Sequence, residues 1–481
     1  MPKQLSSLDA QFLALETDRN YGHVGSVAIL DPSTAGPQGF SLERIKCVLA
    51  EREHMLPPFT RRLAEVPFGL DWPYWVRDEH FDLGYHCREL ALPAPGSMEQ
   101  LREQVARIYS RHLDRSRPLW ELYLIHGLEG GRAALMTKIH HAAVDGMSGG
   151  EVLTLMYDVT PEPRAPDPVE QTAEDESASG RAMLVRTMTA LPGAPVRVVR
   201  RAGRLLPHVD VVPSVLGIPG SETISRALSR VRGGAEVIER PAIRPPKGVY
   251  DGRVSPHRIF GLASISLPDV KRVKDHFGVK VNDVVVALVA GTLRDDLEAR
   301  DALPESPLVA QIPVSVRTDE ERGTFGNQVS VMFVPIPTHL DTPGARVRDA
   351  AEHLRAAKER HGALPAKALR DVTQFIPPAL HARAARAIVD VTPRLGLRPP
   401  YNLVISNVPG PPMDIYSAGA RLEALYPLSI ITDGATLNVT LMSYRESIDI
   451  AITADRELTP DVQAIAERFG AELDELVALC G

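Results

Sequence analysis

Two adjacent histidines, His140 and His141, stand at the end of a mostly apolar segment and are followed closely by Asp145 and Gly146. The preceding residues 132–139 are expected to form a strand, and the small residues after the glycine open a predicted helix. A histidine at the end of a rigid element can be aimed into a cavity. Neutral imidazole is the usual side chain for taking a proton from a hydroxyl nucleophile near pH 7. The pattern therefore predicts proton-transfer chemistry.

Other interpretations fit parts of the same segment. A buried histidine pair beside an Asp-Gly turn needs no chemistry. His140, His141 and Asp145 could be metal ligands, but adjacent strand residues point to opposite faces, and no HExxH or paired CxxC pattern supplies further ligands. Residues 146–150 match the G-x-S-x-G nucleophile elbow of α/β-hydrolases, with Ser148 as the nucleophile. An elbow serine sits on the strand-to-helix turn itself, whereas Ser148 follows an intervening segment.

The composition is that of a globular protein with two cores. A chain of 481 residues is long for a single core, which predicts two domains. The net charge of −7 gives no electrostatic reason to expect nucleic acid as a partner. Three cysteines without metal-site spacing are typical of a reducing compartment. Because no apolar leader or long apolar run is visible, we expect a cytoplasmic protein with at most peripheral membrane contact.

Strands and helices alternate in two similar halves, residues 1–160 and 251–481, which predicts an α/β fold. Residues 161–250 are rich in proline and arginine at their flanks and within, and are interpreted as a crossover linker. Strands are expected at 23–30, 132–139, 257–265, 309–317, 329–336, 403–407, 422–431, 436–444 and 448–453, and helices at 6–15, 42–53, 98–112, 150–157, 267–276, 284–297, 344–361 and 459–479.

Within that linker, the stretch from Arg181 to Arg204 carries six arginines and no acidic residue. Apolar residues between the arginines could form the other face of interrupted helices. Two interpretations remain: a crossover packed between the halves, or a basic amphipathic element that lies on a membrane surface.

Beyond the histidine motif, several segments resemble one family. The HHxxxDG pattern resembles the CoA-dependent acyltransferase superfamily, which includes chloramphenicol acetyltransferase and the condensation domains of peptide synthetases. The whole chain looks like a bacterial wax ester synthase/diacylglycerol acyltransferase, a family numerous in mycobacteria. The matching segments, in order along the chain, are residues 8–12 (LDAQF), 118–121 (PLWE), 282–283 (ND), 313–317 (PVSVR), 326–327 (GN) and 402–410 (NLVISNVPG).

The resemblance implies two chloramphenicol-acetyltransferase-like halves, joined by a helical crossover, with an active-site tunnel between them. It implies an O-acyltransferase that uses long-chain acyl-CoA as co-substrate, with no bound cofactor and no metal. The acceptor would be diacylglycerol or a long-chain alcohol, reached at the inner membrane or a lipid droplet. A transferase acting on another hydroxylated lipid, or a noncatalytic relative that binds lipid surfaces, remains the alternative.

The same resemblance assigns roles to six residues. The second histidine, His141, is the expected general base, and Asp145 is expected to brace the site by pairing with an arginine, for which we choose Arg317. Asn282 is expected either to donate to the oxyanion or simply to cap its helix. Gly146 is expected to serve the turn, because glycine accepts a positive φ. The first histidine of the motif, His140, is expected to pack or hydrogen-bond behind the site.

Overall fold

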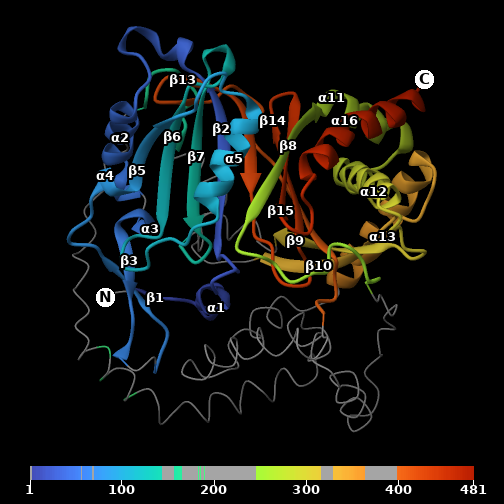
Figure 1. The fold of residues 1–481 in the computed structure, drawn as a ribbon, viewed down its shortest axis with the longest axis horizontal. Coiled ribbons are helices and arrows are strands. Elements are labelled where there is room, and N and C mark those ends of the chain that lie inside the picture. Colours follow the sequence, from blue (N-terminus) through green and yellow to red (C-terminus); the bar gives the residue numbers. More distant parts are fainter. Residues whose placement is uncertain are drawn as a thin grey trace.

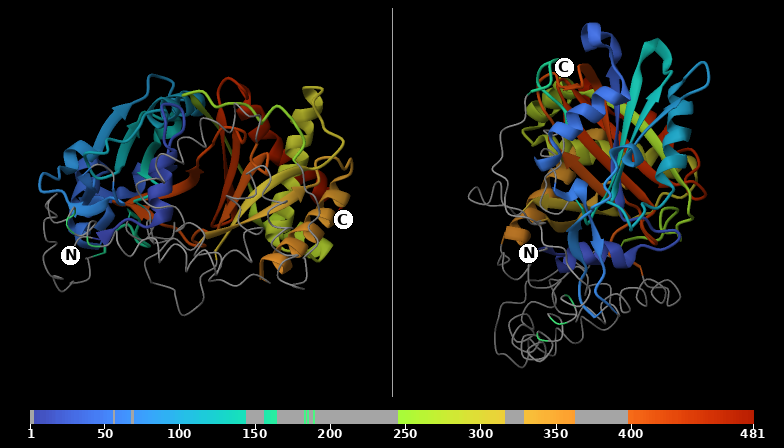
Figure 2. Two further views of the ribbon diagram at one scale, coloured as in Figure 1. Left: turned by 90° about the horizontal axis from the view of Figure 1, so that it is seen from below. Right: turned by 90° about the vertical axis from the view of Figure 1, so that its left-hand side faces the viewer.

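The computed structural model describes residues 3–55, 57–67, 70–143, 156–164, 183, 185, 189, 245–315, 329–362 and 398–481. In this part of the chain, two six-stranded sheets lie side by side, each belonging to one half of the molecule (Figure 1). The predicted α/β class with two sheet-rich halves is confirmed. Seen from below, the blue and teal elements again lie mainly on one side, and the yellow and red ones mainly on the other (Figure 2, left).

The N-terminal sheet holds the histidine-bearing strand near its middle. Strand β7 (Ala133–His140) pairs antiparallel with β2 (His23–Asp31) on one side and with β6 (Trp120–His126) on the other. Since both neighbours hydrogen-bond to β7, the backbone at His140 cannot shift without disturbing three strands. The sheet order is β12 (Tyr416–Ser417), β13 (Ala420–Leu428), β2, β7, β6 and β5 (Cys87–Ala91).

Two strands of this sheet, β12 and β13, come from the far end of the sequence. Strand β13 pairs antiparallel with β2, matching Leu422 with Leu30 and Leu428 with Gly25. In Figure 1 its label lies over the N-terminal half, although the strands that follow it belong to the other half. Residues 416–428 thus belong structurally to the first half. The alternation of strands and helices along the sequence does not predict this placement, because it reports local structure and not strand pairing.

The C-terminal sheet is mixed. Strand β11 runs parallel to β9 and β14, and the other pairs are antiparallel. The sheet order is β10 (Val329–Ile336), β9 (Leu308–Ser315), β11 (Leu403–Val408), β14 (Leu437–Tyr444), β15 (Ser447–Asp455) and β8 (Arg258–Ser266). The remaining described strands, β1 (Lys3–Gln4), β4 (Tyr74–Arg77) and β3 (Arg61–Ala64), form a small sheet for which no strand was predicted.

Seven of the eight predicted helices lie close to their predicted positions, and the helix predicted at 150–157 lies almost entirely outside the described residues. The short helices α3 and α4 were not predicted. Helix α5 packs its apolar side against both the N-terminal sheet and β8, and so fills the space between the halves. Its first turn is closed by a capping box between Ser97 and Gln100. The described helices are α1 (Ser7–Leu15), α2 (Leu42–Glu51), α3 (Pro57–Thr60), α4 (Leu83–His86), α5 (Met98–Tyr109), α11 (Leu267–Phe277), α12 (Val281–Ala299), α13 (Pro343–Gly362) and α16 (Val462–Ala478).

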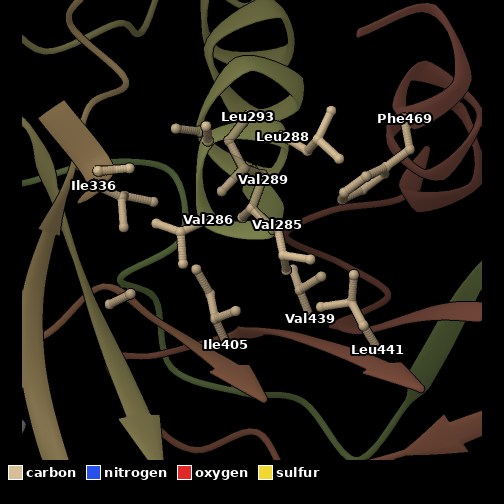
Figure 3. Packing of buried hydrophobic residues seen from close by; sticks show 14 of the residues in the cluster. Val285, Val286, Leu288, Val289, Leu293, Ile336, Ile405, Val439, Leu441 and Phe469 are labelled. Carbon is tan, nitrogen blue, oxygen red and sulfur yellow. The ribbon is translucent and has the colours of Figure 1, made fainter. Parts of the chain in front are cut away.

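Helix α12 is apolar on nearly all sides because it is the centre of the second core. Val286 faces Ile405 of β11, and Val285 faces Val439 of β14 (Figure 3). Phe469 of α16 and Ile336 of β10 lie on opposite sides of the helix. Among the described residues, no single helix has the length and composition of a membrane span. The pair α11 and α12 meets that test only together, across a bend of 104°.

The start of α12 corrects one expectation. The helix begins at Val281, one turn before the predicted 284, with Lys280 as its N-cap residue. The side chain of Asp283 accepts a hydrogen bond from the Lys280 backbone N–H at 2.9 Å. Asn282 therefore lies inside the first turn, and the expectation that it caps the helix is wrong.

Candidate active site

The backbone of the histidine pair is hydrogen-bonded to two neighbouring segments. The His140 N–H donates to the carbonyl of Leu119 at 2.9 Å, and the His141 N–H donates to the carbonyl of Gly22 at 2.8 Å. A turn then begins, in which the Ala143 N–H donates to the His140 carbonyl at 2.8 Å. The two imidazoles consequently leave the strand end at fixed positions.

The two side chains differ in exposure. His140 is 1% exposed, whereas His141 is only partly buried. The His140 Nδ1 accepts the Ala142 N–H at 3.1 Å, so a neutral ring carries its proton on Nε2. This Nε2 faces Oε1 of Glu16 at 3.6 Å, an ion-pair distance and too long for a hydrogen bond. His140 is thus buried beside a carboxylate, and His141 is the more exposed member of the pair.

Glu16 is a buried carboxylate at the end of α1, and sequence reasoning did not identify it. Its Oε2 accepts from Arg115 at 2.7 Å, and its Oε1 accepts the Gly22 N–H at 3.0 Å. His112 Nδ1 lies 3.6 Å from Oε1. Burial opposes ionisation, but the nearby side chains of His112, His140 and Arg115 outweigh it and hold the pKa of Glu16 well below its usual range.

Helix α1 also supplies the neighbour of His141. The ring of Phe12 stacks on the His141 imidazole, with centroids 4.0 Å apart and planes inclined by 17°. Phe12 ends the LDAQF segment noted in the sequence, where it carried no assigned role. The contact covers one face of the imidazole with an apolar surface and restricts its rotation.

Asn282 meets a residue of β11. The Asn407 amide donates to the Asn282 Oδ1 at 3.4 Å, a long hydrogen bond between two partly buried side chains. The Asn282 NH2 group then remains as a donor for another acceptor. Asn407 belongs to the segment 402–410 noted in the sequence, and this contact links it directly to a site candidate.

Trp120 of the PLWE segment lies in the first core. It is 3% exposed, its indole N–H donates to the Phe59 carbonyl at 2.8 Å, and its ring stacks on His86 with centroids 4.6 Å apart. The neighbouring Leu119 carbonyl holds His140, as described above. The PLWE segment therefore supports the motif strand.

Asp145, Gly146, Ser148 and Arg317 lie outside the described residues, as does most of the 161–250 linker. Their roles stay predictions. After the motif loop, the described chain resumes at Met156, and Asp158 forms a buried ion pair with Arg52, with oxygens 2.6 and 2.8 Å from Nη2. Within the ranges that the structure describes, no group of three or more histidine, cysteine or acidic side chains is arranged to hold a metal ion.

Comparison with known proteins covers nearly the full length. Residues 5–285 match the family model of the wax ester synthase/diacylglycerol acyltransferase catalytic domain, and residues 325–477 match that of the C-terminal domain of the same family. A putative diacylglycerol O-acyltransferase of Mycobacterium tuberculosis is 36% identical over 478 residues, which cover 99% of this chain and 90% of the relative. Another from the same species is 37% identical over 99% of this chain and 100% of the relative.

Solved structures show the same architecture. The wax ester synthase/diacylglycerol acyltransferase from Marinobacter aquaeolei VT8 superposes with a TM-score of 0.69 and 27% identity over 100% of both chains. The starter condensation domain of rhizomide synthetase, solved with C8-CoA, gives a TM-score of 0.54 at 13% identity over 99% of this chain and 95% of that one. At that identity the likeness shows a shared fold alone.

Proposed function

Because this chain belongs to the wax ester synthase/diacylglycerol acyltransferase family, we propose that it transfers the acyl group of a long-chain acyl-CoA to a lipid hydroxyl. Diacylglycerol would give triacylglycerol, and a long-chain alcohol would give a wax ester. The observation that carries the residue assignment is the difference between the two histidines. His141 is partly exposed at the end of a fixed strand, whereas His140 is buried against a carboxylate.

In the proposed reaction, His141 removes the proton of the acceptor hydroxyl while its oxygen attacks the thioester carbonyl carbon. The tetrahedral intermediate collapses, the carbon–sulfur bond breaks, and the imidazolium returns the proton to the CoA thiolate. No acyl-enzyme forms. General base catalysis supplies about 10²–10⁴-fold of the acceleration, so positioning and oxyanion stabilisation must supply the remainder.

Asn282 is the proposed oxyanion donor. Its carbonyl oxygen already accepts from Asn407, which leaves the NH2 group to donate to developing negative charge. Asp145 and Gly146 are proposed to shape the motif turn, with Arg317 as the partner of Asp145. Substrates would enter through a tunnel between the two halves.

The substrates dissolve in bilayers or oil droplets, so the enzyme is proposed to visit the inner membrane or a droplet surface reversibly from the cytoplasm. The basic stretch from Arg181 to Arg204, which lies almost entirely outside the described residues, is the proposed contact. Each arginine near an anionic surface contributes about 1 kcal/mol. Charge reversal of four arginines there should weaken binding to anionic vesicles, and unchanged binding would contradict the membrane role.

Two histidine variants test the base assignment. His141→Ala should reduce transfer from radiolabelled palmitoyl-CoA by about 10²–10⁴-fold with the fold intact, while His140→Ala should retain a measurable fraction. Ser148→Ala serves as the matched control and should transfer at the parental rate, because the reaction needs no serine nucleophile. Equal and total loss in both histidine variants at unchanged melting temperature would contradict a single base, and an acyl adduct on Ser148 would indicate a hydrolase-type mechanism.

An acceptor panel tests the substrate class. Purified protein is given radiolabelled palmitoyl-CoA with diacylglycerol, hexadecanol or water, and the lipid products are separated. Labelled triacylglycerol or wax ester supports the proposal. Label only in free fatty acid would identify a thioesterase, and no turnover with any acceptor would favour a noncatalytic lipid-binding protein.

A further inference from the structure

We propose that Glu16 is a positioning residue for the histidine pair, holding both imidazoles in the geometry that transfer requires. This inference rests on the proposed function, because it assigns a role within the same reaction. Glu16 does not belong to the HHxxxDG motif and lies more than a hundred positions before it. Its link to the motif exists only in the folded chain.

The first link runs through the His140 side chain. The ring is held from two sides, by the Ala142 N–H on Nδ1 and by the Glu16 carboxylate facing Nε2. A carboxylate opposite one ring nitrogen favours the tautomer that carries the proton there. Gly22 makes this approach possible, since a Cβ at that position would lie 2.4 Å from the His140 Nε2.

The second link runs through the backbone to His141. Glu16 Oε1 accepts the Gly22 N–H, and the Gly22 carbonyl accepts the His141 N–H. The carboxylate thereby holds Gly22, the residue whose carbonyl accepts the backbone N–H of His141. Glu16 also ends α1, the helix that places Phe12 on the His141 ring. One carboxyl group is thus connected to both histidines and to the helix that covers them.

The two carboxylate oxygens of Glu16 have different partners, and this difference distinguishes a positioning role from a role in ion pairing alone. The Glu16 Oε2 is occupied by Arg115. All contacts toward the histidine pair use Oε1. A carboxylate needed only for folding would act through its salt bridge with Arg115. A positioning carboxylate must act through Oε1, and loss of the arginine should then matter much less for catalysis.

The experiment compares Glu16→Ala and Glu16→Gln with the parent in the full-length protein. Glu16→Ala should lower kcat about 100-fold, since displacing a catalytic group by about 1 Å has an effect of that size. The KM for palmitoyl-CoA should stay within about twofold, because the substrate contacts persist. Glu16→Gln keeps the side-chain length but places an NH2 group against a donor, and should lose about 10-fold in kcat.

Two matched controls accompany these variants. Arg115→Met removes the partner of Oε2 and the Arg115 hydrogen bond to the Leu13 carbonyl, but leaves the contacts of Oε1 in place. It should lower the melting temperature while kcat stays within about threefold, because a partly exposed ion pair contributes little. Glu423→Gln removes a carboxylate that pairs with Arg132 at 2.7 and 3.0 Å near the opposite end of β7. It should leave kcat unchanged. Parental kcat in folded Glu16→Gln, or an equal kcat loss in Arg115→Met, would overturn the proposal.

A readout that does not depend on activity separates this proposal from the proposed function. With 15N-labelled histidine, the His140 ring of the parent should show a protonated Nε2 and an unprotonated Nδ1. The Glu16 variants should lose that signature, and an unchanged His140 signal would refute the positioning role. If the parent transfers no acyl group to any acceptor, the proposed function fails, while the ring signals still decide whether Glu16 holds His140.

Discussion

Lys138, two residues before the histidine pair on β7, should make the stability of the N-terminal half depend on pH in an unusual direction. Its side chain is fully buried. The Nζ donates to the carbonyls of Ile108 and Arg111 and lies 3.7 Å from the Glu121 carboxylate. Burial outweighs the favourable charge of Glu121 and lowers the pKa of Lys138 from 10.5 to about 8.

The sign follows from proton counts. Below pH 8 the folded and unfolded chains both carry the ammonium group. Between about pH 8 and 10.5 the folded chain has released that proton and the unfolded chain still binds it, so this group raises the free energy of unfolding as pH rises. A shift of about 2.5 pKa units corresponds to about 3 kcal/mol over the whole interval, and to about 2 kcal/mol between pH 7 and 9.5.

The assay is urea unfolding of the parent and of Lys138→Met at matched pH values. The parent alone is insufficient, because burial raises the pKa of the Cys87 thiol to about 12 and that group changes stability in the opposite direction. The effect of Cys87 cancels in the difference between parent and variant, which should grow by about 2 kcal/mol from pH 7 to 9.5. Lys271→Met, at an exposed position, is the control and should give a constant difference. A constant difference for Lys138→Met would refute the reasoning.

Two further predictions concern the supports of the motif. Gly22→Ala should reduce acyl transfer at least about 10-fold, because its methyl group would displace His140. The control is Gly470→Ala, which lies in open space on α16. It should leave the transfer rate unchanged and stabilise the helix by about 0.5–1 kcal/mol in thermal unfolding. Arg52→Met leaves Asp158 buried without its guanidinium, and should lower the free energy of urea unfolding by about 3–5 kcal/mol. Parental transfer by Gly22→Ala, or parental stability of Arg52→Met, would contradict these assignments.

The elements of this fold were largely predictable from local pattern. The strand at 329–336 has its predicted bounds, and the motif strand, expected at 132–139, occupies 133–140. Such segments can be recognised in the sequence because their apolar side chains repeat with the period of the element that buries them. The small sheet containing β3 and β4 was missed, since its strands are short and follow a proline-rich stretch.

The site was predictable in part for the same reason. His140 and His141 are adjacent, and alternation along a strand already separates their directions. Asn282 was singled out for its place at a helix start, yet its interpretation as a cap failed. The helix begins one turn earlier, and the Asn282 side chain meets Asn407 instead. A capping preference describes the residue type, whereas the partner depends on which strand lies beside the helix.

The sequence by itself determined the alternating α/β elements, the histidine pair at a strand end, and the proton-transfer chemistry that those residue types favour. The tertiary structure decided which histidine is buried, that Glu16 and Phe12 lie against the pair, and that β12 and β13 complete the N-terminal sheet. The physical reason is the distance along the chain over which each effect acts. Propensity and periodicity act between near neighbours, whereas burial and pairing depend on segments brought together by folding, and no single-sequence pattern records those distances.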